Sequence, residues 1–407
     1  MPKPLPIAAT FSKSPVFWGV DFEPKELAWG VGAHVYDRAG NRYLDWVSGL
    51  GANLLGYANV DFCCRLADQA FEGIGFSLPH VLEARVAEKL ANLLGTHVPG
   101  WSPDTLGVRF GLSGTDATTM AVRLARAVTG RQRVLSSGYS GWADWSIGKT
   151  PPAWGVAPQN VVDLPFNDKQ QLVELAVVVK PDDAPAAIIL EHPMVDPEPN
   201  YYEYVRHICD KTGALLIMDE VVTGFRWALG GASEVYGIKP DIVCYGKALG
   251  NGVPISAIVG HRAYFEWFER NDPVFVSSTH FGNALSLAAA DAVLDIWDQW
   301  GVWHLWEMGN DLMEGLRLCQ IHGYRVIGHG PRSLIQFDSP EERAYFIVGM
   351  RDRGILMNRP ILPNLAHMAE DVRLTTEAAG EVWTEMQKID VKEVMRERLP
   401  RVLFEER

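Results

Sequence analysis

The chain has little of what membrane or exported proteins require. No uninterrupted apolar run approaches the roughly 18 residues that a membrane-spanning helix needs. The N-terminal segment lacks the basic start, the apolar stretch and the small-residue cleavage site of a signal peptide. The five cysteines are odd in number, and Cys63 and Cys64 are adjacent, which does not suit a disulfide framework. We therefore expect a soluble protein of the reducing cytoplasm that does not enter a membrane.

The chain also has fewer basic than acidic residues. Lysine and arginine together number 37, against 50 aspartates and glutamates, which gives a net charge of -13 at pH 7. This negative field disfavours binding to nucleic acid or to anionic lipid, so small molecules are the expected partners. The 11 histidines and five cysteines show neither paired CxxC nor HExxH spacing, and the sequence therefore gives no reason to expect a metal.

The length and the order of patterns predict two structural units. The 407 residues exceed the roughly 250 to 300 beyond which a single core usually stops growing. Apolar and aromatic residues on either side of a turn predict a hairpin from Ala33 to Trp46. Further on, short β-rich runs alternate with helical stretches, the pattern of a largely parallel sheet covered by helices on both faces. We expect residues 56–290 to form this large domain, and residues 1–55 to pack with a small C-terminal domain of residues 291–407.

The large domain should contain a series of short apolar strands bounded by turn-forming residues. They are Leu106 to Phe110, Arg133 to Ser136, Ala186 to Leu190, Ala214 to Met218, Asp241 to Cys244 and Ile255 to Val259. The small domain has strand-like runs at Tyr324 to Ile327 and at Ser333 to Phe337, followed by two helices. In open α/β sheets ligands bind beyond the carboxyl ends of the strands, so the residues that follow each strand are the functional candidates.

A small-residue loop follows the first of these strands and opens a helix. Ser113, Gly114 and Thr115 lie in it, and the next residues are spaced to present one face to a core. Free N–H groups and the positive end of the helix dipole would bind a phosphate there. The alternative is that Ser113 or Thr115 simply caps the helix. The loop matches neither the GxGxxG of dinucleotide folds nor the GxxxxGK[ST] of nucleotide-phosphate loops.

An aromatic residue follows the second strand. Tyr139 lies between Gly138 and Gly141, and glycines let the backbone bend close to a ligand. Its ring could stack on a flat cofactor, and the alternative is a partly buried tyrosine whose hydroxyl is hydrogen-bonded.

The strand that begins at Ala214 runs directly into carboxylates, Asp219 and Glu220. A carboxylate at the end of an apolar strand needs a partner. A protonated pyridine nitrogen would be one, and pairing with Asp219 would keep that nitrogen charged so that the ring can accept electrons. Val221 would face the same side and support the ring. An ordinary buried salt bridge or a metal ligand is the alternative for Asp219.

A lysine follows the next strand. A lone lysine is usually a solvated surface charge. Lys247, however, comes after an apolar strand, has small residues around it, and has Asp219 as a candidate counter-charge at the end of the preceding strand. We therefore predict that Lys247 reaches the same cleft as Asp219.

Several stretches resemble one enzyme family. LLIMDEVVTGFRWALGGASEVYGIKPDIVCYGKALGNGVPISAIVG resembles the cofactor-binding core of class III aminotransferases, particularly the glutamate-1-semialdehyde aminomutase branch. SGTDATTMAVRLARAVTGR is similar to the phosphate-cup helix of that branch, and the segment from Thr279 to Asn283 to its T-x-x-G-N motif. GAHVYDRAGNRYLDW resembles the N-terminal hairpin of the family.

The resemblance implies a fold and a set of roles. The fold would be α/β, of the aspartate-aminotransferase type (fold type I), with a mostly parallel sheet in the large domain and a smaller α+β domain. The protein would be a homodimer with shared active sites. Lys247 would carry the cofactor pyridoxal 5'-phosphate (PLP) as a Schiff base, Asp219 would pair with the pyridine nitrogen, and Val221 would pack under the ring. The remaining cofactor residues would be Ser113, Gly114 and Thr115 on the phosphate, Tyr139 on the ring, and Thr279 on the phosphate of the neighbouring subunit.

The implied reaction is amino-group transfer between an amine or amino acid donor and an aldehyde, ketone or keto acid. Lys247 would be both the tether and the base that moves a proton. Isomerisation by a glutamate-1-semialdehyde 2,1-aminomutase-like enzyme, epimerisation of an amino acid and decarboxylation stay open as alternatives. So does a cofactor-binding protein that has lost catalysis.

The substrate side departs from the aminomutase branch. Where that branch usually has S-P-V-R with a carboxylate-binding arginine, this chain has Phe17 next to Trp18. An apolar residue there suggests a less polar substrate, unless another arginine replaces the lost one. Arg226 and Arg359 are the candidates for that replacement, and Trp142 is a candidate wall of the pocket.

Overall fold

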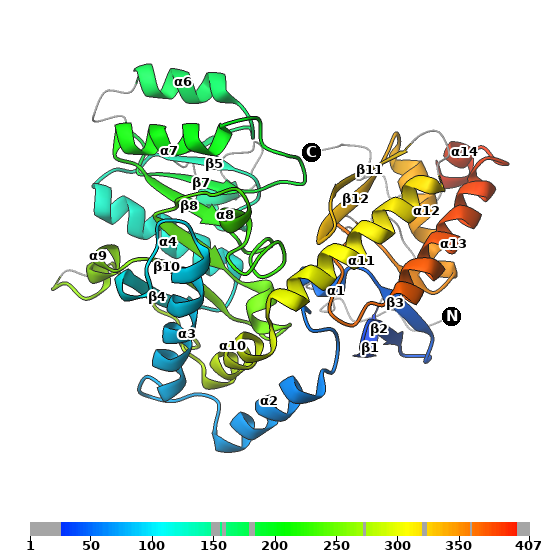
Figure 1. Ribbon diagram of the computed structural model, residues 1–407, viewed down its shortest axis with the longest axis horizontal. Coiled ribbons are helices and arrows are strands. Elements are labelled where there is room, and N and C mark those ends of the chain that lie inside the picture. Colours follow the sequence, from blue (N-terminus) through cyan, green and yellow to red (C-terminus); the bar gives the residue numbers. More distant parts are fainter. Residues whose placement is uncertain are drawn as a thin grey trace. The chain divides into compact units, whose positions relative to one another are not determined.

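A computed structural model describes residues 26–147, 155–156, 160–178, 184–271, 274–319, 324–358 and 360–396. These residues form two compact units (Figure 1). Of the described residues, the first unit combines Glu26 to Ser48 with those from Trp306 onward, and the second runs from Gly49 to Leu305. Phe17, Trp18 and Arg359 lie outside the described residues.

The second unit is built on a seven-stranded sheet of order β4-β10-β9-β8-β7-β5-β6. The strands are β4 (Leu106–Gly111), β5 (Val134–Ser137), β6 (Val161–Asp163), β7 (Ala187–Glu191), β8 (Leu215–Asp219), β9 (Ile242–Tyr245) and β10 (Ser256–His261). The pairs β5/β6, β5/β7, β7/β8 and β8/β9 are parallel, whereas β10 is antiparallel to both β4 and β9. All strands expected for this unit are present, with bounds close to those expected. The three-residue edge strand β6 was not expected.

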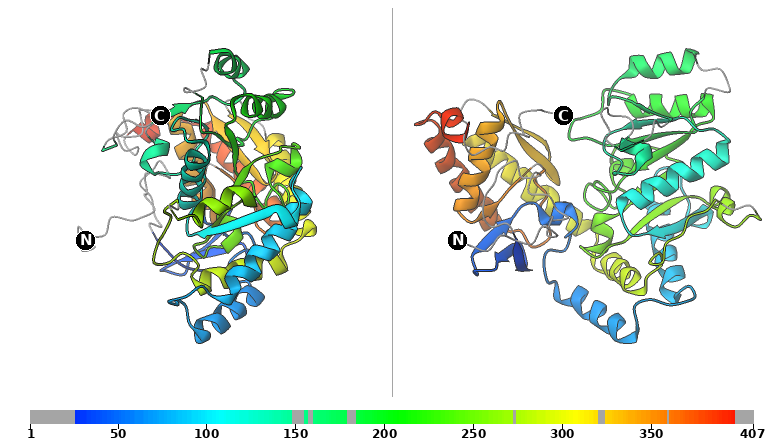
Figure 2. Two further views of the ribbon diagram at one scale, coloured as in Figure 1. Left: turned by 90° about the vertical axis from the view of Figure 1, so that its left-hand side faces the viewer. Right: turned by 180° about the vertical axis from the view of Figure 1, so that it is seen from behind.

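Helices cover the sheet because its central strands are apolar up to their last residues. Every residue of β7, β8 and β9 is buried, as expected for strands packed on both faces. Helix α4 (Gly114–Thr129) contacts β4, β7, β8, β9 and β10, and α7 (Tyr201–Thr212) contacts β8 (Figure 2). The other helices of eight or more residues that lie in this unit are α2 (Val60–Glu72), α3 (Val81–His97), α6 (Lys169–Val178) and α10 (Ala284–Ile296). The shorter ones are α1 (Ser48–Gly51), which starts at the unit boundary, α5 (Asp144–Ile147), α8 (Ala232–Val235) and α9 (Arg262–Phe265).

The first unit joins the two ends of the chain. Strands β1 (Leu27–Val31), β2 (His34–Asp37) and β3 (Arg42–Asp45) form an antiparallel meander, and β13 (Ile355–Leu356) pairs with β3 in parallel. A second sheet pairs β11 (Tyr324–His329) with β12 (Arg332–Phe337). The expected hairpin turn is held by the Asp37 carboxylate, which accepts hydrogen bonds from the backbone N–H groups of Ala39 and Asn41, both at 2.9 Å. The helices are α12 (Pro340–Asp352), α13 (Ala369–Met386), α14 (Val391–Arg396) and most of α11 (Gln299–Leu318).

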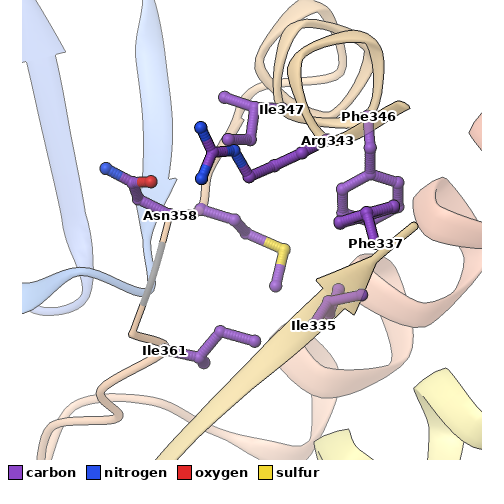
Figure 3. Close-up of a pocket in the computed structure, with 8 residues that line it drawn as sticks. Ile335, Phe337, Arg343, Phe346, Ile347, Asn358 and Ile361 are labelled. Atoms are coloured by element: carbon purple, nitrogen blue, oxygen red, sulfur yellow. The ribbon is translucent and has the colours of Figure 1, made fainter. Parts of the chain in front are cut away.

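The core of the first unit contains a small apolar pocket (Figure 3). Its lining comes from β12, α12 and the segment after β13: Ile335, Phe337, Arg343, Phe346, Ile347, Met357, Asn358 and Ile361. No residue that the sequence nominated for function lines this pocket. Within the described ranges, no helix combines the length and the apolar character needed to cross a membrane.

Candidate active site

The described residues predicted to bind a cofactor within this chain all lie in the second unit, at or just after the carboxyl ends of its strands. Ser113, Gly114 and Thr115 begin α4 after β4, Tyr139 follows β5, Asp219 ends β8 with Val221 just beyond, and Lys247 follows β9. Strands β5, β8 and β9 run in the same direction, so their carboxyl ends meet at one edge of the sheet. This edge is where an open α/β sheet binds its ligand.

The start of α4 is a capping box. The Ser113 hydroxyl accepts a hydrogen bond from the Asp116 N–H at 3.2 Å. In return the Asp116 carboxylate accepts from the Ser113 N–H at 2.8 Å and from its hydroxyl at 2.9 Å. Ser113 therefore has the capping role that the sequence allowed as an alternative. Phosphate binding by this loop stays a prediction.

Close glycine contacts bring three of the loops together. A Cβ atom on Gly114 would lie 2.7 Å from Cγ1 of Val221, and one on Gly246 would lie 3.5 Å from the same atom. A Cβ on Gly141, at φ 94°, would lie 2.5 Å from the Thr115 hydroxyl oxygen. The loops after β4, β8 and β9 therefore pack on one another, and at Gly114 there is no room for a side chain. The loop after β5 reaches the same place through Gly141.

Asp219 is a buried carboxyl group of this site. Only 3% of its surface is exposed, and its Oδ1 accepts a hydrogen bond from the Val221 N–H at 3.1 Å. Burial raises the pKa of the Asp219 carboxyl, the negative charge of Glu191 raises it further, and the positive charge of Lys247 opposes both. A buried carboxyl group of this kind fits a cationic ligand atom, because the positive charge of the ligand would stabilise the carboxylate form that burial disfavours.

Lys247 begins a short 3-10 helix, η4 (Lys247–Gly250), with its backbone in the left-handed region at φ 41°. Residues other than glycine rarely adopt this conformation, and they persist in it where the surrounding structure enforces it, often at functional sites. The strand before Lys247 is fully buried, so the main chain that carries the lysine is fixed. The side chain is partly buried.

Two acidic residues belong to this region although the sequence analysis assigned them no role. Glu191 ends β7, and its Oε2 accepts a hydrogen bond from the Tyr139 N–H at 2.9 Å. Glu220 accepts from the Thr223 hydroxyl, from the N–H groups of Ala232 and Ser233 at 2.8 and 2.7 Å, and from the Ser233 hydroxyl at 2.7 Å. Glu191 had the same signal as Asp219, a carboxylate directly after an apolar strand.

The remaining nominated residues differ in exposure. The side chains of Tyr139 and Trp142 are 66% and 72% exposed, and Thr279 is also exposed, so each is accessible to a ligand or to another chain. Arg226 is fully buried in the loop that Glu220 holds. Its proposed contact with a substrate stays a prediction.

Comparisons with known proteins agree on one family. The family profile described as Aminotransferase class-III matches residues 25–389. The glutamate-1-semialdehyde 2,1-aminomutase of Gemmatimonas aurantiaca is 36% identical over 328 residues, covering 75% of this chain and 72% of the relative. The enzyme of the same name from Symbiobacterium thermophilum is 31% identical over 404 residues, covering 89% and 91%. Among solved structures, the PLP internal aldimine form of the FumI protein of Sphingopyxis sp. MTA144 superposes with a TM-score of 0.82 at 26% identity, covering 95% of this chain and 94% of that one.

Proposed function

Because the chain belongs to the class III aminotransferase family, we propose that it transfers an amino group between an amine or amino acid donor and an aldehyde, ketone or keto acid. The expected enzyme class, fold type I and PLP as cofactor are confirmed by the family match and by the structural neighbours. The observation that carries the proposal for the site is the placement of buried Asp219 at the end of β8, with Lys247 after the adjacent strand β9.

The described residues fit PLP. Asp219 would pair with the pyridine nitrogen, Val221 would pack on one face of the ring, and Lys247 would hold the aldehyde carbon as a Schiff base. The close contact at Gly114 leaves backbone rather than a side chain next to Val221, which suits the close approach of a flat ring and its phosphate. When bound, PLP supplies an electron sink for a carbanion at the substrate carbon.

The chain's own part in the reaction follows from these positions. The Lys247 amine would be the base that removes a proton from the substrate carbon. Asp219 keeps the ring nitrogen protonated, because a buried carboxylate stabilises a neighbouring positive charge. Ser113, Gly114 and Thr115 would orient the phosphate through N–H groups at the start of α4.

A second candidate function is a glutamate-1-semialdehyde 2,1-aminomutase-like isomerisation. It is supported by the names of the relatives at 36% and 31% identity. Phe17 stands where the aminomutase branch has its carboxylate-binding arginine, and this favours transfer to or from a less polar substrate. Epimerisation on the same scaffold differs in keeping the amino group on its original carbon.

We also propose a homodimer with Thr279 serving the neighbouring active site. Large apolar side chains are exposed on α2 and on the connection from α2 to α3, including Phe71 at 93% and Leu78 at 79%. Such a patch is typical of an interaction surface. Exposed Thr279 is accessible to a second copy.

The test has two independent readouts. Borohydride reduction of the PLP-loaded protein, followed by peptide mapping, should place the label on Lys247, and a label elsewhere would refute the site assignment. A screen of amine donors with carbonyl acceptors should show donor loss matched by the keto product, only when an acceptor is present. Isomerised glutamate-1-semialdehyde, racemised amino acid or released carbon dioxide without transfer would instead identify one of the alternative reactions.

A further inference from the structure

Glu191 stands next to Asp219 at the edge of the sheet that carries the cofactor site. It is the last residue of β7, and in the parallel pairing of β7 with β8 it lies opposite Asp219. Only 7% of its surface is exposed. Two neighbouring buried carboxylates repel one another, so a second acid at this point is unfavourable unless favourable contacts offset the repulsion.

One hydrogen bond indicates the role of Glu191. The Tyr139 N–H donates a hydrogen bond to Oε2 of Glu191 at 2.9 Å. The residue before it, Gly138, has φ 84°, and a Cβ atom there would lie 2.7 Å from Cβ of Glu191 and 3.0 Å from its Oε2. The loop after β5 therefore passes directly over the Glu191 carboxylate, and only glycine fits at the crossing.

The contact matters because of what the loop carries. The Tyr139 side chain is 66% exposed, so in the chain itself its position depends mainly on the backbone. The hydrogen bond to Glu191 holds that backbone at the end of β7. Asp219, the residue expected to pair with the pyridine nitrogen, lies beside Glu191. A charge-assisted hydrogen bond from a carboxylate to a backbone N–H is among the stronger single anchors available.

We propose that Glu191 is a positioning residue of the PLP site, whose carboxylate holds the Tyr139 backbone beside Asp219 and so orients the Tyr139 ring on the cofactor. This inference rests on the proposed function and on the stacking of Tyr139 on PLP that the family resemblance implies. Glu191 acts through Tyr139 and takes no part in proton transfer.

The test compares Glu191→Ala with Glu191→Gln in the PLP-loaded protein. Alanine removes the acceptor, whereas glutamine keeps an oxygen that can accept from the Tyr139 N–H. The readouts are the visible circular dichroism of bound PLP, which reports the orientation of the ring in its asymmetric surroundings, and the PLP dissociation constant. Glu191→Ala should lose most of the visible band and bind PLP roughly 10- to 100-fold more weakly. Glu191→Gln should stay within about threefold of the wild type.

Two further variants make the result specific. Glu203 lies exposed on α7, and Glu203→Ala makes the same charge change without touching the site, so its spectrum should match the wild type. Gly138→Ala leaves the carboxylate in place but pushes the loop off it, and should reproduce the dichroism change even if Glu191→Ala does not fold. A normal visible band and normal PLP affinity in either Glu191→Ala or Gly138→Ala would overturn the positioning role alone. A wild-type protein that takes up no PLP would instead refute the proposed function, and the positioning role with it.

Discussion

Asp219 and Glu191 are direct neighbours on the parallel strands β8 and β7, and both are almost fully buried. Their charges are not isolated. Lys247 attracts Asp219, while Glu220, the next residue along the chain, repels it. Cys244 lies opposite Asp219 on β9, and burial together with the two carboxylates at 219 and 220 raises the pKa of its thiol, so it stays neutral. Burial and the neighbouring carboxyl groups therefore favour the neutral form of Asp219 until a cationic ligand atom pairs with it.

Asp219→Asn should change how the stability of the PLP-free protein depends on pH. Burial, then Glu191, raises the pKa of Asp219 in the folded state. A raised carboxyl pKa gives stability that is fully present below the unfolded value and is lost as the pH rises through the folded value. Between the unfolded and the folded pKa of Asp219, the free energy of unfolding of the wild type should therefore fall by up to about 1.4 kcal/mol per pH unit because of this carboxyl group. That of Asp219→Asn should not fall for this reason.

Urea unfolding of both proteins without PLP, at about pH 6 and about pH 8, measures this difference. Asp144→Asn, at an exposed position in α5, is the control and should follow the wild type. An equal pH slope for Asp219→Asn and the wild type would contradict the buried charge. With PLP added, the wild type should become the more stable of the two proteins. Asparagine cannot pair with a protonated ring nitrogen, and binding adds stability only where it is tight.

Gly114→Ala should disturb the junction between α4 and the loop after β8. The new methyl group would lie 2.7 Å from Cγ1 of Val221, so one of the two segments must move. Overpacking of this kind costs about 1–3 kcal/mol, and the shift should also weaken PLP binding. Gly75→Ala is the matched control, since a Cβ atom there meets nothing within 4 Å. Chemical denaturation measures the stability of both variants. Equal stabilities of Gly114→Ala and Gly75→Ala would contradict the expected overlap with Val221.

Much of this site follows from the sequence because its parts lie at strand ends. Apolar runs that stop at Asp219 or before Lys247 mark the ends of buried strands, and parallel strands bring such ends together. Glu191 carries the same mark and was overlooked because no sequence pattern connects it to Tyr139. Contacts across the fold, such as Gly114 against Val221, depend on three-dimensional packing that no local spacing encodes.

The strands that sequence reasoning missed are short or exposed. β6 has three residues and lies at the edge of its sheet, and β13 has two. β1 is largely exposed, so it lacks the apolar alternation that marks a half-buried strand. The reversed direction of β10 was also not foreseen, since hydrophobic pattern alone does not distinguish parallel from antiparallel pairing in a fully buried strand.

Glu220→Ala should destabilise the loop that follows β8. The Glu220 carboxylate accepts from two backbone N–H groups and two hydroxyls between Thr223 and Ser233. Alanine would leave the N–H groups of Ala232 and Ser233 buried without an acceptor, at about 1–3 kcal/mol each. Gly231→Ala should damage the same loop by steric overlap, because its Cβ atom would lie 2.1 Å from Oε2 of Glu220.

Denaturation midpoints of Glu220→Ala, Gly231→Ala and the exposed control Glu203→Ala test this expectation. Glu220→Gln should be intermediate, since its oxygen accepts but its NH2 group faces donors. A Glu220→Ala protein as stable as Glu203→Ala would show that the loop does not depend on this carboxylate.

Phe71→Asp should break the proposed homodimer. The Phe71 side chain on α2 is 93% exposed, and Leu78 in the following connection is 79% exposed. If a second copy covers this patch, a charge at its centre would be buried without a partner, and the dimer should weaken by at least roughly 30-fold. Sedimentation velocity at several protein concentrations measures the change. Val173→Asp is the control, because Val173 is a less exposed apolar residue on α6, and it should leave the assembly intact. A dimeric Phe71→Asp protein would place the interface elsewhere, whereas a monomeric wild type would contradict the homodimer itself.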